Sequence, residues 1–386
     1  MRPSSLHDRG FTLLEVLIGF AIGLVVLAGA AQLYSKAMDV SDQLNAQGEM
    51  QQNARAGINS VVQDVSLAGT GGMPQTGIAL PSGNGATNPA IACDNTPKCY
   101  VISGGSSINF SDAVLHVITP LGKVGQNNAA GTSGTDVVTL AFGDSDPNFQ
   151  IDCKPLTSIV QTPASGTPTS FKLTLDPTTF SAACPAAPSP AMNPLLTPSD
   201  GLVVGDVLAL SNVNGMAAAV VTGITESAGS HTVTLGSTDL LSYNQFGGTA
   251  GTLTTNLSNK NSNPPVYPST SVFRIWVVSY FVYKQPDGTL RLMRQVNARP
   301  PVPVAENVDD FIVTYDTYDQ NTSVDKANLD ASQVFSPPTT NNANNIRKVN
   351  LQLTVRSSKP IKGQYQHFRL ITSVDPRALG YQDRYQ

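Results

Sequence analysis

The most constraining feature of the chain is an apolar run close to its N-terminus. The run extends from Phe11 to Ala31 and contains one charged side chain, Glu15. As a helix it would be about 31 Å long, which is enough to cross the hydrocarbon core of a bilayer. A secretory signal has a shorter apolar region, of about 7–15 residues, followed by a small-residue cleavage site. The run is therefore predicted to be a membrane span or a buried assembly helix.

Glu15 is costly in such a helix. A carboxylate near the centre of a membrane span costs about 2.5–3.5 kcal/mol, so residues of this kind usually have a function. The cost falls when the carboxylate pairs with a cation and keeps its hydrogen bonds. We expect Glu15 to pair with a cationic group or to reach toward the membrane surface.

The residues around this position, Arg9-Gly10-Phe11-Thr12-Leu13-Leu14-Glu15-Val16, resemble the processing motif of type IV prepilins. The resemblance implies cleavage after Gly10 by a membrane prepilin peptidase and methylation of the new amino group on Phe11. It also places Glu15 at the fifth mature position, where its carboxylate would pair with the Phe11 amine of a neighbouring subunit. Glu15 would then set the register of assembly.

Beyond Ala31 the sequence becomes amphipathic without a proline. One helical stripe contains apolar side chains, and a polar face accompanies it. The stripe consists of Ile58, Val61, Val62 and Val65, with Leu44 and Met50 further back; the polar face consists of Lys36, Asp39, Asp42, Glu49, Arg55 and Asp64. We predict one helix over residues 11–68, ended by the glycines that follow, whose far half packs on a head.

The head is predicted to be rich in β-structure. Residues 69–270 read as a loop-rich β region, with strand-like segments at 137–140, 206–210 and 232–235. Residues 271–386 read as an antiparallel sheet region. Its expected strands are 273–283, 289–296, a strand from Val308 to Tyr315 entered through a bulge, 349–355 and 368–374. With a leader over residues 1–10, the predicted fold is α+β: a long helix on an antiparallel sheet, with a large loop-rich β insertion.

The body resembles PilW-type minor pilins. The stretches that match are Gly134 to Val138, Gly205 to Leu208, Glu306 to Val308 with Phe311 and Tyr315, and Val349 to Arg356. The resemblance implies a low-abundance subunit that primes pilus assembly with other minor pilins and the major pilin, and that meets a tip-associated adhesin. It implies a single-pass inner-membrane protein with a periplasmic head before assembly, and a place at the pilus tip afterwards.

All four cysteines lie in the expected exported part. They are Cys93, Cys99, Cys153 and Cys184. Three pairings are possible, and sequence order favours Cys93 with Cys99 and Cys153 with Cys184. Oxidation outside the cytoplasm makes disulfides the expected state. Zinc is the other interpretation, but the spacing matches metal-ligand motifs poorly.

Two acidic stretches have the oxygen spacing of a calcium loop. The first consists of Asp144, Asp146, Asn148 and Asp152, and the second of Asp319, Asn321, Ser323 and Asp325. In the first, Phe149 replaces the usual glycine and Pro155 the final glutamate. Solvated polar turns are the other interpretation. No other cofactor is expected.

Charge and motifs limit the remaining functions. The net charge of -4 gives no positive field for a phosphate backbone, so nucleic acid is not an expected partner. The sequence contains no H-E-x-x-H, G-x-S-x-G or Walker motif. We therefore expect a non-enzymatic assembly protein. The alternatives are a type II secretion pseudopilin, a tip adhesin acting as a binding module and a membrane-tethered hydrolase.

Overall fold

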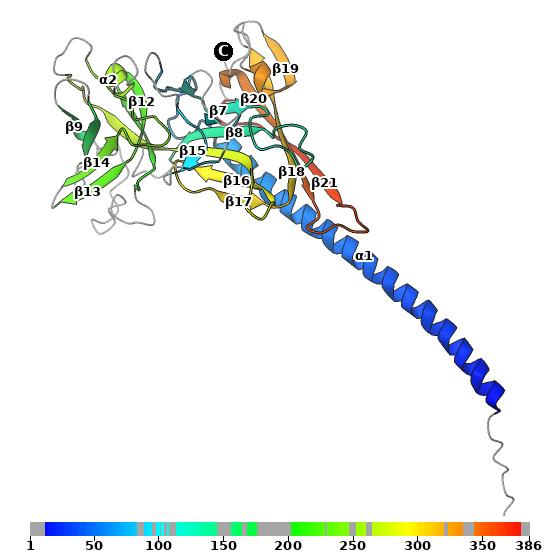
Figure 1. The fold of residues 1–386 in the computed structure, drawn as a ribbon. Helices are drawn as coiled ribbons and strands as arrows, with labels where there is room; N and C mark the ends of the chain where they lie inside the picture. The colour runs from blue at the N-terminus through cyan, green and yellow to red at the C-terminus, as the bar shows by residue number, and fades with distance from the viewer. Residues whose placement is uncertain are drawn as a thin grey trace, which may run out of the picture.

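The fold was analysed in a computed structural model of the chain. The structure describes residues 12–82, 89–94, 98–100, 102–103, 106–107, 113–144, 156–163, 168–175, 202–227, 230–246, 252–259, 265–319, 323–334 and 343–379. A single long helix, α1 (Leu13–Leu67), leads into a β-rich head (Figure 1). The predicted α+β class is confirmed.

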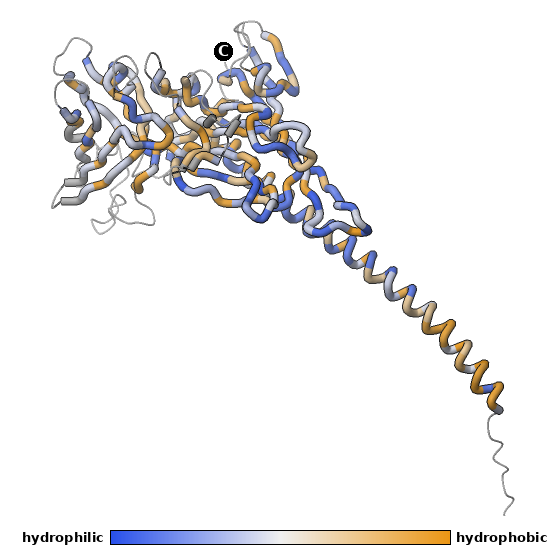
Figure 2. The backbone as a smooth tube through the Cα atoms, viewed as in Figure 1, coloured by the Kyte–Doolittle hydropathy of each residue, from blue (hydrophilic) through white to orange (hydrophobic). Residues whose placement is uncertain are grey.

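The two ends of α1 have different surroundings. Every side chain from Thr12 to Met38 is exposed, and this free half is strongly apolar (Figure 2). From Asp39 onward the helix lies against the head. In this docked half (Asp39–Leu67), the buried residues are Met50, Ala54, Gly57, Ile58, Val61, Asp64 and Val65. The predicted stripe is confirmed for most of its members, but Leu44 is 63% exposed and lies outside the core.

The centre of the head is a seven-stranded antiparallel sheet. Its longest strand, β15 (Ser271–Lys284), is nearly all buried, as the continuous apolar run predicts. β15 pairs with β11 near its start, β8 in its middle and β16 near its end. The other members are β7 (Ile118–Leu121), β8 (Val137–Gly143), β11 (Val207–Asn212), β12 (Gly215–Val220), β16 (Leu290–Val296) and β17 (Val302–Ala305).

A second, four-stranded sheet also packs on α1 and shares its core. Its order is β19-β18-β20-β21, with β18 (Val308–Asp319), β19 (Val324–Leu329), β20 (Ile346–Arg356) and β21 (His367–Val374). The register of β18 against β20 shifts between Val308 and Asp310, which confirms the predicted bulge. Alternate side chains of β18 and β20 enter the core shared with α1 and the central sheet.

A third sheet lies far from the helix (Figure 1). This distal sheet has the order β13-β14-β10-β9, from β9 (Leu156–Thr162), β10 (Ser170–Leu175), β13 (Gly223–Ser227) and β14 (Ser230–Gly236). Together with α2 (Thr252–Leu257) and one face of β11 and β12, it encloses a second apolar cluster. The short elements are β1 (Ile78–Ala79), β2 (Cys93–Asp94), β3 (Lys98–Cys99), β4 (Ile102–Ser103), β5 (Ser106–Ser107), β6 (Val114–Leu115), α3 (Ala331–Val334) and the 3-10 helix η2 (Ala343–Asn345).

The sheets correct the predicted organisation in two ways. The division between residues 69–270 and 271–386 passes through one sheet, because β15 pairs with β8 and β11 from the preceding region. The strands after residue 270 also belong to two sheets instead of one. Alternation along a strand predicts which face is buried, but it does not specify the neighbouring strand.

Candidate functional site: the N-terminal helix and its junction with the head

The first turn of α1 is closed by a capping box. The backbone N–H of Glu15 donates to Thr12 Oγ1 at 3.3 Å, and the backbone N–H of Thr12 donates to Glu15 Oε2 at 3.1 Å. This reciprocal pair satisfies two N–H groups that have no partner within the helix. The Glu15 carboxylate is therefore held at the positive end of the helix dipole. Gly10 and Phe11 lie outside the described residues.

The free half of α1 presents a continuous apolar surface. Leu13 is 81% exposed, and Phe20, Val25 and Leu33 are each more than 70% exposed. A Cβ atom built on Gly19 or on Gly23 meets nothing within 4 Å. A surface of this size needs lipid or protein around it. The free half is thus a segment that other molecules must cover, and its length and composition are sufficient for a membrane span.

The docked half crosses the head at Gly57. A Cβ atom at this position would lie 2.8 Å from Ala305 Cβ and 3.2 Å from Leu353 Cδ2. Ala305 ends β17 in the central sheet, and Leu353 lies in β20 of the second sheet. Gly57 therefore allows close contact between the helix and both sheets, which sequence reasoning had not found.

A buried ion pair fixes the last turns of the docked half. Arg294 Nε donates to Asp64 Oδ2 at 2.6 Å and Arg294 Nη2 to Asp64 Oδ1 at 3.1 Å, and the Tyr280 hydroxyl also donates to Asp64 Oδ2, at 2.6 Å. The side chain of Ser60 lies 2.9 Å from the Tyr280 hydroxyl. Burial raises the pKa of the Tyr280 hydroxyl well above its usual range, and the adjacent Asp64 adds to this increase. The Tyr280 hydroxyl is therefore a fixed donor.

The position of Asp64 corrects the prediction that placed it on the exposed polar face. Its side chain is 7% exposed, because the sheet beneath supplies the guanidinium of Arg294. The helical spacing could have predicted this burial, because Asp64 lies three residues after Val61 and seven after Gly57, on the buried stripe.

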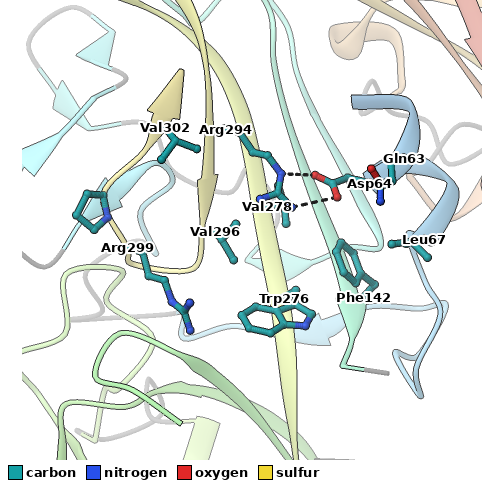
Figure 3. A pocket seen from close by; sticks show the side chains of 11 residues that line it. Gln63, Asp64, Leu67, Phe142, Trp276, Val278, Arg294, Val296, Arg299 and Val302 are labelled. Carbon is teal, nitrogen blue, oxygen red and sulfur yellow. Dashed lines mark hydrogen bonds and ion pairs between the residues drawn. The ribbon is translucent and has the colours of Figure 1, made fainter. Parts of the chain in front are cut away.

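A cavity of about 560 Å³ opens beside this ion pair (Figure 3). One wall is the end of α1, and the floor is the face of the central sheet that carries Trp276 and Val278. Two cationic side chains lie over the Trp276 ring, Arg274 at 4.3 Å and Arg299 at 5.3 Å. The cavity thus has a mixed lining, and its charged groups already have partners within the chain.

These two arginines belong to a second ion cluster, which contains Asp144, one of the calcium candidates. Asp144 Oδ2 accepts from Arg274 Nε at 2.6 Å, and Asp206 Oδ1 accepts from Arg299 Nη2 at 2.5 Å. Arg274 also reaches Asp206, at 3.4 Å, and so joins the two pairs. Asp144 therefore joins the end of β8 to β15. Asp146, Asn148 and Asp152 lie outside the described residues.

The second calcium candidate falls at the tip of the β18–β19 hairpin. Asp319 is buried and opposite Val324 in the register, while Ser323 and Asp325 are exposed. Asn321 lies outside the described residues. Among the residues that the structure describes, no group of three or more His, Cys, Asp or Glu side chains is placed to hold a metal ion. Calcium binding at this hairpin stays a prediction.

One predicted disulfide is confirmed. Cys93 and Cys99 are bonded across the paired strands β2 and β3. The backbone carbonyl of Cys93 accepts from Gln295 Nε2 at 2.9 Å, which connects this small hairpin to β16. Cys153 and Cys184 lie outside the described residues. A structural disulfide is typical of proteins that fold in an oxidising compartment.

Comparison with known families gives one match. The model of the prokaryotic N-terminal methylation motif matches residues 6–31. The chain carries a prepilin-type signal. The match covers the predicted cleavage site, Glu15 and most of the free half of α1. It supports a type IV pilin-like protein, of a pilus or a pseudopilus, and is consistent with processing by a prepilin peptidase and assembly with other pilins. Comparisons with curated proteins and with solved structures find no match.

Proposed function

We propose that the chain is a PilW-like minor pilin that primes type IV pilus assembly and joins the pilus tip complex. The observation that carries the proposal is the combination of a prepilin-type signal at residues 6–31 with a helix whose first half has no partner within the described chain. Such a helix is anchored in the inner membrane before assembly and packed among other pilin helices afterwards. In this proposal the role of the chain is structural and not enzymatic.

The shape of the head favours the tip. The distal sheet lies beyond the docked end of α1 and to one side of it, which makes the head wide (Figure 1). Inside a filament, each subunit has neighbours above and below, and a wide head would meet the heads of those neighbours. At the tip no subunit lies above, so a wide head fits there. The partners would be other minor pilins and the major pilin below, and a tip-associated adhesin above.

Assembly at the level of the helix would depend on Glu15. After cleavage, the amine of Phe11 and the Glu15 carboxylate of an adjacent subunit would form an ion pair in an apolar environment, where an unpaired charge is costly. The capping box shows that Glu15 is held by its own first turn in the isolated chain. The carboxylate has acceptor capacity beyond the Thr12 groups, so pairing with a neighbour adds to the cap.

The test is the incorporation of Glu15→Gln into sheared pili. We expect about a tenfold or greater loss of incorporation, since a charge-assisted pair is lost where no water replaces it. Glu49→Gln, on the exposed side of the docked half, is the matched control and should assemble normally. Wild-type incorporation of Glu15→Gln would refute the register role.

A type II secretion pseudopilin is the alternative, because it would share the signal and the helix. Deleting the gene separates the two. Loss of surface pili with normal secretion supports the pilus, and loss of protein secretion with normal pili supports the pseudopilus.

Immunogold labelling of the head at filament ends would support the tip position, while labelling along the shaft would contradict it. A dedicated tip adhesin is tested by the binding of the head to cells, and a hydrolase by turnover of ester or peptide substrates.

A further inference from the structure

The contact between α1 and the head begins at a defined position along the helix. Side chains are exposed up to Met38, and partly buried ones then recur at Asp39, Gln43 and Ala46 before the buried Met50. These steps of three and four residues mark one face of the helix. The segment from Thr12 to Met38 is about 40 Å long at the rise of an α-helix. A bilayer including its headgroups is about 40–45 Å thick.

This match places Asp39 at the outer surface of the membrane. If the free half spans the bilayer, the hydrocarbon ends near Leu33, and Tyr34 and Lys36 lie among the headgroups. Tyrosine and lysine are typical of this interface. The part of the head that contacts Asp39 is therefore at the height of the lipid headgroups.

That part is the connection between β20 and β21. Of the described head, it extends furthest along α1 toward the N-terminus (Figure 1). Its residue Lys362 lies beside the helix, with Nζ at 3.6 Å from Asp39 Oδ2. Both side chains are at least half exposed, so this pair contributes little to folding and leaves the ammonium accessible.

The connection is held rigidly. The backbones of Ile361 and Gln364 exchange two hydrogen bonds, of 2.8 and 3.1 Å. Between them, Lys362 and Gly363 have φ values of 52° and 80°, as in a two-residue hairpin turn with both central residues left-handed. Further along, Phe368 and Leu370 of β21 pack against the core. The tip thus has a fixed position relative to α1.

The charge of this region differs from that of the chain. From Ser357 to Gln366 there are two Lys residues and no Asp or Glu, although the whole chain has 23 basic and 27 acidic residues. At the tip, the side chains of Lys359 and Lys362 are exposed, and Tyr365 is 41% exposed. On the adjacent helix, Lys36 adds a cation, while Asp39, Asp42 and Glu49 are acids, and Glu49 lines a cavity with Ser358. The tip itself carries cations only.

We propose that the tip of this hairpin, Ser358–Tyr365, is a membrane foot that binds anionic lipid headgroups beside the point where α1 leaves the bilayer. Lys359 and Lys362 donate to lipid phosphates, and Tyr365 lies at the interface. Because the foot is fixed to α1, its contact sets the height and rotation of the head before assembly. Extraction of the subunit breaks this contact. The inference rests on the proposed membrane insertion of the free half.

The test is photo-cross-linking of the full-length chain in vesicles. A benzophenone amino acid replaces Ser358 in the foot, Val213 at the β11–β12 turn or Leu24 in the free half. Lipid adducts are measured by mass spectrometry in vesicles of phosphatidylglycerol or of phosphatidylcholine. We expect adducts at 358 and 24 but not at 213, and a higher yield at 358 in phosphatidylglycerol.

Charge variants complete the test. Each Lys near an anionic surface contributes about fivefold to binding, so Lys359→Gln with Lys362→Gln should lower the yield at 358 about tenfold or more. Lys172→Gln, in the distal sheet, should leave it unchanged. Lipid adducts at residue 24 without adducts at residue 358 would refute the membrane foot but not the membrane insertion of the free half. Adducts at 358 that do not depend on lipid charge or on the lysines overturn headgroup binding. Absence of adducts at 24 overturns the membrane insertion in the proposed function.

Discussion

The two halves of α1 form one continuous helix but differ in their pattern of apolar residues and in their surroundings. In the free half, apolar side chains lie on every side, and the glycines at positions 19, 23 and 29 face open space. In the docked half, apolar residues follow one stripe, and Gly57 has the head within 2.8 Å of the position of its absent Cβ atom. A helix that is apolar all round needs a surrounding of lipid or protein, whereas an amphipathic helix needs one partner surface.

This difference shows how a membrane segment and a folded domain can share an element. The docked half belongs to the hydrophobic core of the head and is stabilised by it. The free half contributes nothing to that core. It is therefore free to contact lipid or other helices while the head stays folded. Four changes to the chain test whether the two halves are independent, in order of decreasing expected effect on the stability of the head.

The largest effect is expected for Gly57→Leu. The new side chain would overlap Ala305 and Leu353, so the helix must move away from both sheets. Overpacking of this kind costs about 3 kcal/mol of folding free energy. Urea unfolding of the full-length chain in detergent measures the loss. Gly48→Leu, at an exposed position with nothing within 4 Å, is the control and should be neutral or slightly stabilising. Equal effects of the two variants would contradict the crossing at Gly57.

A smaller loss is expected for Asp64→Ala. The substitution leaves the guanidinium of Arg294 without its carboxylate in a largely buried position, which costs about 2 kcal/mol. Asp42→Ala, on the exposed side of the helix, should change the stability by less than about 0.5 kcal/mol.

Adding Arg294→Met to Asp64→Ala should restore part of the stability, because the unpaired charge is then removed. A double-mutant cycle measures this coupling. Additive losses would show that the pair does not fix the end of α1 to the central sheet.

The smallest effect on the head is expected from removing the free half. A chain that begins at Ser35 retains every helix residue that the head buries. Its unfolding midpoint should lie within about 2 °C of that of the full-length chain, and it should be soluble without detergent. Circular dichroism during heating provides the measurement. A head that unfolds after this truncation would show that the two halves are not independent.

Much of this architecture can be predicted from local sequence. The apolar run gives the free half, the glycines after Leu67 give the end of α1, and alternation gives strands such as β20. The prepilin-type signal is also local, since all its residues lie within a short segment. Each of these features depends on neighbours in the chain.

The parts that escaped prediction depend on distant partners. β8 and β15 are more than 100 residues apart, and nothing in either strand specifies the pairing. The ion cluster of Asp144, Asp206, Arg274 and Arg299 combines four separate loops or strands. Asp64 looked solvent-exposed because its partner, Arg294, comes 230 residues later. A carboxylate on a buried stripe is a usable signal of such a partner.

The central claim is that the free half of α1 becomes a mature pilin segment. Intact mass of the protein isolated from cells tests it most directly. We expect the loss of residues 1–10 and the addition of one methyl group on the amine of Phe11, with neither change when the prepilin peptidase is deleted. A mature protein that keeps Gly10 and everything before it would contradict the account.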